Sequence, residues 1–300
     1  MNRFTASVAI LLLIIASANC SWFRVKQTRQ VPPNQRALPA KTASKSELID
    51  RLNSIANSTQ TLNLRAYLEL TGGSANTPEV EKYRESEGYI LVKKPSLIRI
   101  IVLAFKVTVF DMVSNEKETS LYVPPKNKFY HFINDQKIEN LKIPVGNMRP
   151  YHIFQAVAVE PIGSDQKRDE IILEEDQEGR KKFYILNILK KSLDGFERKI
   201  WIDRFDLNLV RQKIFNDNGK VGSDISYSNF KEFNGVPYPT EINFRRPQEE
   251  YSLRIQVKNL KMNEVLKDAQ FVLEKPAGAE LVELAEKTKI PEDRPVGLTR

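Results

Sequence analysis

The dominant pattern along this chain is an alternation of apolar and polar residues with a period of two, which is typical of β-strands with one buried face. The clearest example is the segment 62–71, where Leu62, Leu64, Ala66, Leu68 and Leu70 alternate with more polar neighbours. The same signal predicts further strands along the chain. They are residues 87–93, 97–103, 107–113, 120–123, 128–133, 169–175, 182–188, 197–203, 210–216, 223–230, 241–246 and 252–260.

Two segments depart from this period and predict helices. Ser44 and Glu47 are spaced as a capping box, in which the two residues satisfy free backbone N–H groups at the start of a helix. Pro150 stands in the first turn of the second helix, residues 149–159, where a proline costs no hydrogen bond. The apolar positions that recur on one face are Leu48, Leu52 and Ile55 in the first helix and Ile153, Phe154 and Val157 in the second.

The connections between the predicted strands are short, and Asn218-Gly219 and Asn234-Gly235 are strong reverse-turn signals. Parallel neighbours would need crossovers of about a dozen residues or more, so the strands must pair antiparallel. A sheet of about eleven to thirteen strands curls, and two short helices cannot fill it. The predicted fold class is therefore mainly β (α+β): a large antiparallel sheet curled into an unclosed β-barrel, with lid or plug helices over an apolar cavity.

The N-terminal segment carries the features of an export signal. Arg3 is followed by the uncharged apolar run 8–15 and then by the small residues Ala16, Ser17 and Ala18. The apolar run is far shorter than the roughly twenty residues that a membrane-spanning helix needs. Residues 1–19 are therefore predicted to be a signal peptide, and the chain is expected to leave the cytoplasm.

Cys20, the only cysteine, stands directly after this segment and allows two interpretations. In the first, the signal is that of a lipoprotein, and the thiol is acylated and anchors the chain in a membrane. In the second, the signal is cleaved after Ala18 and leaves a free thiol. Ser17 and Asn19 depart from the usual lipoprotein pattern, but a lone cysteine at this boundary favours acylation.

The chain is predicted to have four parts, of which the signal peptide is the first. After the signal peptide, residues 20–43 are predicted to be a lipidated N-terminus and flexible tether, 44–284 a half-open β-barrel domain, and 285–300 a loose tail. The expected location is the cell envelope, as a periplasm-facing lipoprotein anchored in the outer membrane. Without acylation of Cys20 the protein would be soluble in the periplasm.

Composition narrows the partners. The chain is 41% hydrophobic, enough for a packed core, and its formal net charge is +8. A basic protein outside the cytoplasm favours anionic partners, such as lipid head groups or acidic protein surfaces, although the charge is equally consistent with a solvated surface. No nucleic-acid partner is expected, because Lys and Arg are interspersed with Asp and Glu and no nucleic-acid motif is present.

Catalytic and metal-binding motifs give little support for an enzyme. His131 and His152 are the only histidines, and no paired-cysteine or H-E-x-x-H motif accompanies them. The chain also has no G-x-S-x-G nucleophile motif and no glycine-rich phosphate loop. We therefore expect no cofactor, no metal and no catalytic residue, although carboxylates that converge in space would escape this reasoning.

Beyond these patterns, several segments resemble a known family in their order and spacing. Residues 88–99 (GYILVKKPSLIR) are similar to the strand–turn–strand signature of the LolA/LolB-like lipoprotein-carrier superfamily, and 199–203 (KIWID), 234–242 (NGVPYPTEI) and 276–278 (PAG) follow in the family's order. The resemblance covers most of 44–284. It implies an unclosed β-barrel with helices as a lid over a cavity for acyl chains. It also implies that the basic residue before the proline, here Lys94, helps to latch the lid.

The leading hypothesis is a non-enzymatic envelope lipoprotein that binds an acyl chain, a lipid or a lipoprotein, as carrier or acceptor. Its membrane contact would include the N-terminal lipid anchor. The alternative is an envelope scaffold with a filled β core, whose surface binds protein, and an enzyme ranks third. Nine residues are candidates for lining the cavity or forming the lid, and for each of them the alternative is a position in a closed core. The candidates are Leu64, Leu68, Ile90, Val92, Ile98, Ile100, Ile153, Phe154 and Trp201.

Overall fold

The computed structural model describes residues 39–73, 80–115, 117–134, 148–163, 170–190, 192 and 195–283. The described helices and strands all belong to one compact unit, residues 40–300. The predicted signal peptide, Cys20 and the predicted tail after residue 284 lie outside the described residues.

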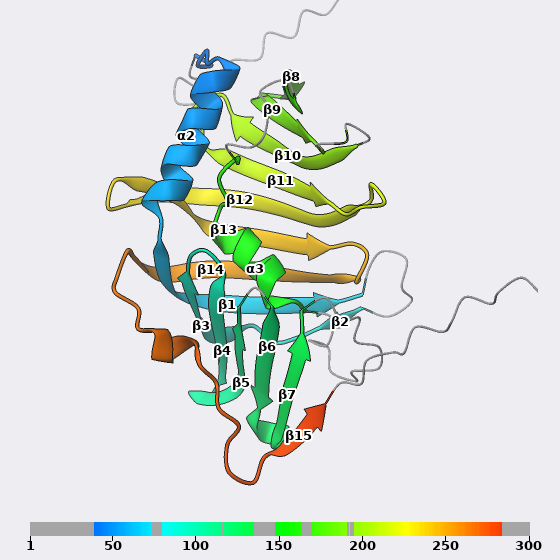
Figure 1. The fold of residues 1–300 in the computed structure, drawn as a ribbon. Helices are drawn as coiled ribbons and strands as arrows, with labels where there is room; N and C mark the ends of the chain where they lie inside the picture. Colours follow the sequence, from blue (N-terminus) through cyan, green and yellow to red (C-terminus); the bar gives the residue numbers. More distant parts are fainter. Residues whose placement is uncertain are drawn as a thin grey trace, which may run out of the picture. The chain divides into compact units, whose positions relative to one another are not determined.

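One large sheet forms the framework of this unit (Figure 1). Neighbouring strands follow the order β15-β7-β6-β5-β4-β3-β1-β14-β13-β12-β11-β10-β9-β8, and β2 pairs with β1 beyond the end of β3. All pairs are antiparallel except β15 with β7. The strands are β1 (Thr61–Gly72), β2 (Glu81–Lys82), β3 (Ser86–Lys93), β4 (Leu97–Ala104), β5 (Val107–Ser114), β6 (Glu118–Val123), β7 (Lys128–Ile133), β8 (Ile171–Glu178), β9 (Lys181–Leu189), β10 (Phe196–Asp203), β11 (Leu209–Phe215), β12 (Val221–Phe233), β13 (Val236–Arg246), β14 (Tyr251–Met262) and β15 (Glu280–Glu283).

The sheet is not closed, because β15 and β8 stand at its two ends and do not pair with each other. In Figure 1 the strands β9–β14 run across the view, whereas β4–β7 run nearly down it. The sheet therefore turns strongly along its width, as expected for one with so many twisted strands. The predicted fold class, a mainly β protein with a large curled and unclosed sheet, is confirmed.

The predicted strands recur with small changes at their ends, and two short strands are additional. The two-residue strand β2 is too short to show any periodicity. Strand β15 is parallel to β7, where Glu280 lies opposite Lys128 and Leu281 lies opposite Phe129. Short connections require antiparallel pairing, but β15 is joined to β14 by a long segment and pairs with the distant strand β7, so the pair can be parallel.

Two helices lie in front of the sheet in Figure 1. Helix α2 (Lys45–Ser58) begins with the predicted capping box, in which Ser44 is the N-cap and Glu47 accepts from its backbone N–H at 2.7 Å. Helix α3 (Pro150–Val157) begins at its proline and has no side-chain cap. Short 3₁₀ helices occupy Pro124–Lys126 and Asp268–Phe271. Both predicted α-helices are confirmed.

The alternation of each strand places one row of side chains on the inner face of the sheet, which is the face that packs against the helices. Leu64, Ile90, Ile100 and Met112 are consecutive cross-strand partners on β1, β3, β4 and β5, and none is more than 3% exposed. They belong to one large hydrophobic cluster that also contains Phe154 of α3. This continuous apolar surface supplies most of the burial that stabilises the unit.

Candidate functional site

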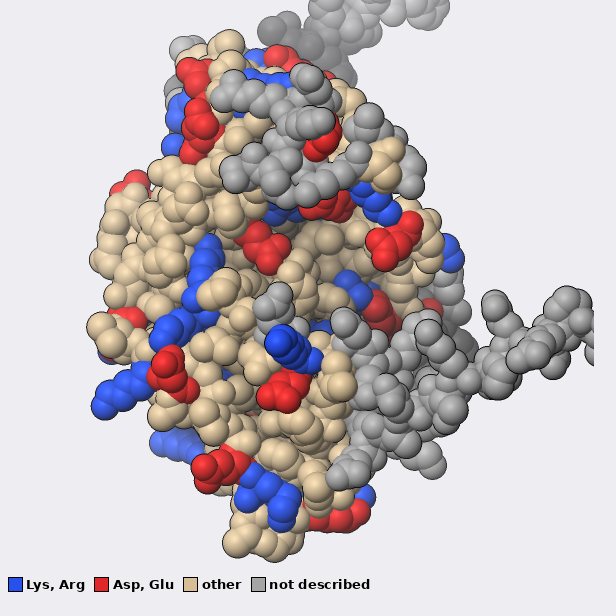
Figure 2. Space-filling view, viewed as in Figure 1, with Lys and Arg blue, Asp and Glu red and all other residues tan. Residues whose placement is uncertain are grey.

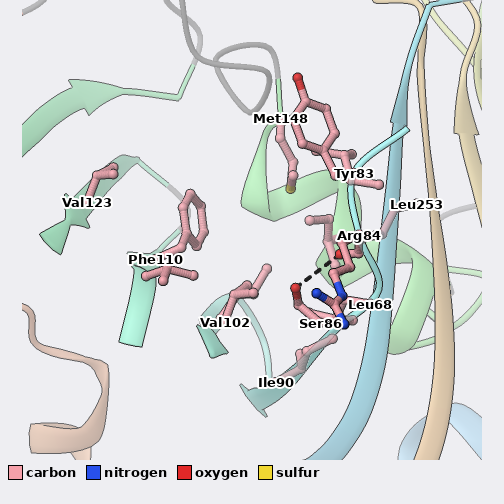
Figure 3. A pocket seen from close by; sticks show the side chains of 14 residues that line it. Leu68, Tyr83, Arg84, Ser86, Ile90, Val102, Phe110, Val123, Met148 and Leu253 are labelled. Atoms are coloured by element: carbon pink, nitrogen blue, oxygen red, sulfur yellow. Dashed lines mark hydrogen bonds between the residues drawn. The ribbon is translucent and has the colours of Figure 1, made fainter. Parts of the chain in front are cut away.

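An apolar cavity of about 270 Å³ lies between the inner face of the sheet and α3. Of the fourteen described residues that line it, twelve are apolar or aromatic, and the other two are Arg84 and Ser86. In Figure 3, Val102, Phe110 and Met148 surround the hollow, and Tyr83 and Arg84 stand along one side. The lining residues are Leu68, Leu70, Tyr83, Arg84, Ser86, Ile90, Ile100, Val102, Val109, Phe110, Val123, Met148, Ile153 and Leu253.

Local sequence explains why this part of the inner face is open. Helix α3 has only eight residues, which corresponds to about 12 Å, so it covers a small part of a wide sheet. On β3, Gly88 leaves room for Leu68, since a Cβ at position 88 would lie 2.7 Å from Leu68 Cδ1. The Leu68 side chain therefore lies back against β3 instead of filling the hollow.

Four of the predicted cavity residues meet here. Leu68, Ile90 and Ile100 line the cavity from β1, β3 and β4, and Ile153 lines it from α3. Their convergence follows from pairing, because Ile90 and Ile100 are direct cross-strand partners.

The other apolar candidates on these elements lie in close-packed core. Leu64, Val92, Ile98 and Phe154 are at most 1% exposed and belong to the same hydrophobic cluster, but they do not line the cavity. For these four residues, the alternative that they belong to a closed core is the one that the structure shows.

Trp201 lies on the opposite face of the sheet from the cavity. Its neighbours Ile200 and Ile202 are 1% exposed in the core, so the intervening residue points the other way. The Trp201 ring lies under the guanidinium of Arg211, 5.4 Å from its Cζ, and 5.7 Å from Lys213 Nζ. The structure thus separates Trp201 from the other candidates, because its position is one residue out of phase with the buried side of its strand.

Several lining residues were not among the sequence candidates. Val102 and Phe110 are cross-strand partners on β4 and β5, and Val102 shares its face with Ile100. The alternation of apolar and polar residues in these two strands could therefore have identified Val102 and Phe110 as lining residues from the sequence. Tyr83 and Arg84 lie in the connection between β2 and β3, where no periodic pattern points to a site.

Lys94 joins the two helices. Its Nζ donates a hydrogen bond of 2.6 Å to the carbonyl of Ala56 in the last turn of α2, and one of 3.1 Å to the carbonyl of Val159, just after α3. The Ala56 carbonyl is one of the last four of α2, which have no N–H donor within the helix. Burial lowers the pKa of Lys94, and the negative charge of Glu160 opposes that shift.

Further donors hold the C-terminal end of α3. Tyr238 Oη donates to the carbonyl of Val157 at 2.8 Å, and Gln212 Nε2 donates to that of Gln155 at 3.2 Å. The buried Arg198 donates to the carbonyl of Glu160 at 3.2 Å. The segment 155–160 is thus tied to β10, β11 and β13, whereas the N-terminal end of α3 has no side-chain cap.

A second hollow lies beneath α2, lined by Leu52, Thr59 and Tyr238 among others, but its volume is only about 40 Å³. That space is comparable to about one water molecule. A third hollow, of about 430 Å³, is lined by Trp201 together with charged residues such as Asp176, Glu178 and Lys181. The cavity beside α3 is smaller, but its lining is apolar and it has room for part of an acyl chain.

His152 of α3 is the one strongly shifted histidine among the described residues. Burial lowers its pKa to about 3, and the positive charges of Arg246 and Arg149 add to the effect. The imidazole is thus neutral at physiological pH. Its Nδ1 is buried and has no hydrogen-bond partner among the described residues.

Within the described part of the chain, no group of three or more His, Cys, Asp or Glu side chains is placed to hold a metal ion. The described helices include none with the length and apolar character needed to cross a membrane. On the face seen in Figure 2, Lys and Arg are interspersed with Asp and Glu, and neither sign forms one continuous patch.

Comparison with known proteins gives similar folds at low sequence identity. A domain described as that of an outer membrane lipoprotein-sorting protein from Vibrio parahaemolyticus has a TM-score of 0.50 and 11% identity, over 75% of this chain and 94% of that one. A LolA superfamily protein from Nitrosomonas europaea has a TM-score of 0.46 and 10% identity, over 77% and 99% of the two chains. A DUF1329 family protein from Desulfovibrio piger has a TM-score of 0.48 and 16% identity, over 75% and 94%.

A family model described as an uncharacterized protein matches residues 157–275, a span shorter than half of the chain. No curated protein matches the chain significantly. At these identities the structural likeness shows the fold, and the fold expected from the resemblance of residues 88–99 and the later segments is confirmed.

Proposed function

We propose that this chain, which has the LolA-like fold, holds an acyl chain or a similar apolar ligand in the cavity beside α3 and transfers it or accepts it at a membrane of the cell envelope. The observation that carries the proposal is the cavity itself, which is about 270 Å³ in volume and has twelve apolar or aromatic lining residues. An apolar cavity of about 150 Å³ already stays dry and accepts a benzene-sized ligand. A fatty chain gains free energy in such a space because its surface leaves water.

The contacts of α3 support a carrier whose lid can move. The C-terminal side of this helix is tied to the sheet through Tyr238, Gln212 and Arg198, and Lys94 ties its end to α2. Ile153, near the uncapped end, lines the cavity. We propose that the helix swings about its C-terminal ties and that Lys94 latches both helices, which would widen or narrow the entrance.

An exposed apolar turn beside the cavity supports contact with a membrane. Phe105 and Val107, at the turn between β4 and β5, are 88% and 64% exposed. The Phe105 ring lies 5.6 Å from Cζ of Arg84, a residue that lines the cavity. An exposed Phe next to cationic side chains is the combination that enters the interface of a lipid bilayer. A ligand could thus leave the cavity directly into the membrane.

The proposal is tested with delipidated full-length protein and the neutral fluorescent probe N-phenyl-1-naphthylamine. A carrier binds the probe at low-micromolar concentration or better. Val102→Trp places a large ring inside the cavity, so we expect its probe affinity to fall about tenfold, which corresponds to about 1.4 kcal/mol of lost binding free energy. Val265→Trp is the matched control, because Val265 is 89% exposed and does not line the cavity.

The outcome separates the two hypotheses for this protein. If wild-type protein does not bind the probe, or if Val102→Trp binds it as well as Val265→Trp does, the cavity is not a ligand site. The scaffold hypothesis, in which the core is filled and the outer surface binds protein, would then be favoured.

The membrane anchor is a separate part of the proposal and rests on the sequence alone. We propose that Cys20 is acylated and that the protein is an outer membrane lipoprotein that faces the periplasm. Mass spectrometry of the native protein measures the acyl mass directly, and Cys20→Ala should release the protein from the membrane fraction. A variant that stays membrane-bound with an unchanged mass increment would exclude this anchor.

A further inference from the structure

Among the described residues, the lining of the cavity carries a single charged side chain. Arg84 is the only one of the fourteen lining residues that is charged at neutral pH. It lies between β2 and β3, is exposed to solvent, and contributes to the cavity wall together with Tyr83 and Ser86. A cation at the border between an apolar hollow and water is placed to meet the polar end of a ligand.

Three carboxylates close to Arg84 in the chain or in the neighbouring strand have other partners. Glu69 pairs with Lys82 at 2.5 Å, Glu87 pairs with Arg65, and Glu81 accepts a hydrogen bond from the hydroxyl of Tyr83. Among the residues that the structure describes, none forms an ion pair with Arg84, the adjacent Glu85 included.

The local structure also holds Arg84 in place. Ser86 Oγ donates a hydrogen bond of 3.1 Å to the Arg84 carbonyl, which Figure 3 shows as a dashed line, and this contact fixes the short connection before β3. The guanidinium lies over the ring of Phe105, with 5.6 Å between Cζ and the ring centroid. A cation–π contact of this kind orients the side chain and leaves the N–H groups at the edge of the guanidinium able to donate.

The size of the cavity limits the apolar part of the ligand. Its volume of about 270 Å³ is less than twice that of an apolar cavity of about 150 Å³ that accepts a benzene-sized molecule. This space accommodates part of one acyl chain, and it is too small for the two or three chains of a diacyl or triacyl lipid side by side.

We infer that the ligand is a single-chain amphiphile with an oxyanion head group, whose chain enters the cavity and whose carboxylate or phosphate is bound by Arg84. This inference rests on the proposed function, because it needs the cavity to hold an acyl chain. Arg recognises carboxylate and phosphate through paired N–H donors, whereas an alcohol or an ester offers it no charge. The neutral acyl chains of a lipoprotein would not use this feature.

The test measures displacement of N-phenyl-1-naphthylamine from the delipidated full-length protein by four competitors below their micelle concentrations. They are palmitate, palmitoyl lysophosphatidic acid, hexadecanol and methyl palmitate. Because the site is partly exposed to water, we expect the favoured anion to bind about fivefold more tightly than hexadecanol to the wild type. Arg84→Gln should remove this preference and leave hexadecanol binding within about twofold.

Arg180→Gln is the matched control, since Arg180 is an exposed residue in the turn between β8 and β9 and does not line the cavity. It makes the same change in net charge and should keep the wild-type preference. A loss for palmitate alone identifies a carboxylate head group, and a loss for the lysophosphatidic acid alone identifies a phosphate.

Two results separate this inference from the proposed function. If the wild type does not bind the probe, the proposed function itself fails. If the probe binds normally but the anions bind no better than hexadecanol, or if Arg84→Gln and Arg180→Gln behave alike, Arg84 does not recognise a head group and only the present inference is overturned.

Discussion

Lys94→Met should loosen both helices at once. Methionine keeps approximately the length of the side chain and removes the ammonium that donates to Ala56 at 2.6 Å and to Val159 at 3.1 Å. A hydrogen bond from a charged group contributes about 1.5–3 kcal/mol. The burial that lowers the pKa of Lys94 offsets part of this contribution, so we expect the free energy of unfolding to fall by about 2 kcal/mol in total.

The neighbouring residue supplies a matched control. Lys93 Nζ pairs with Asp268 at 2.6 Å, but the Asp268 side chain is 84% exposed. Exposed ion pairs contribute between about 0 and 1 kcal/mol, because water screens the charges and two long side chains lose entropy. Lys93→Met removes the same charge from an adjacent position, so we expect it to lower the free energy of unfolding by about 0.5 kcal/mol or less.

The assay combines urea unfolding with amide hydrogen exchange. Urea unfolding gives the two free energies, and exchange shows where the structure opens. For Lys94→Met we expect faster exchange in the last turn of α2 and throughout α3, with the central strands β1 and β14 unchanged. If Lys94→Met and Lys93→Met lose the same stability, or if exchange in the helices does not change, Lys94 does not couple them.

Three further predictions address other parts of the domain. The lowered pKa of His152, about 3, means that the unfolded chain binds a proton that the folded chain excludes, so stability is complete above about pH 6.5 and is lost as the pH falls toward 3. Between pH 8 and pH 5 the wild type should lose about 2 kcal/mol more than His152→Gln in urea unfolding, and equal losses in the two proteins would refute the assignment. Gly88→Ala places a Cβ 2.7 Å from Leu68 Cδ1 and 2.8 Å from the carbonyl oxygen of Ile101, so it should cost about 1–3 kcal/mol of stability in the same assay. It should also weaken probe binding by moving Leu68 into the cavity. Trp201→Ala should change probe affinity by less than about twofold, since a change of that size is under about 0.5 kcal/mol; a large loss in the probe titration would show that the ring reaches the ligand.

Part of the candidate site could be predicted from the sequence. The alternation in β1, β3 and β4 identified Leu68, Ile90 and Ile100 as residues on one face, and the helical period identified Ile153. These signals are local, because each depends only on which side of its own strand or helix a residue occupies. The alternation along β10 would also have shown that Trp201 faces the opposite side of the sheet from its buried neighbours Ile200 and Ile202.

Other features depend on which elements meet. Arg84 lies in an aperiodic connection, and its place at the cavity follows from the pairing of β2 and β3 with β1. The contacts of Lys94 with Ala56 and Val159 join residues that are 38 and 65 positions away in the chain. No periodic signal relates such distant positions, so their proximity required the tertiary structure.

The sequence by itself determined which side of each strand is apolar, where both helices begin, and that the strands pair mostly with their neighbours along the chain. These are properties of short segments, set by backbone geometry, capping and turn residues. Only the tertiary structure decided which part of the inner face is packed and which is hollow. That distinction depends on how far the sheet turns and on how little of it the eight-residue helix α3 can cover, and both result from all the contacts of the domain together.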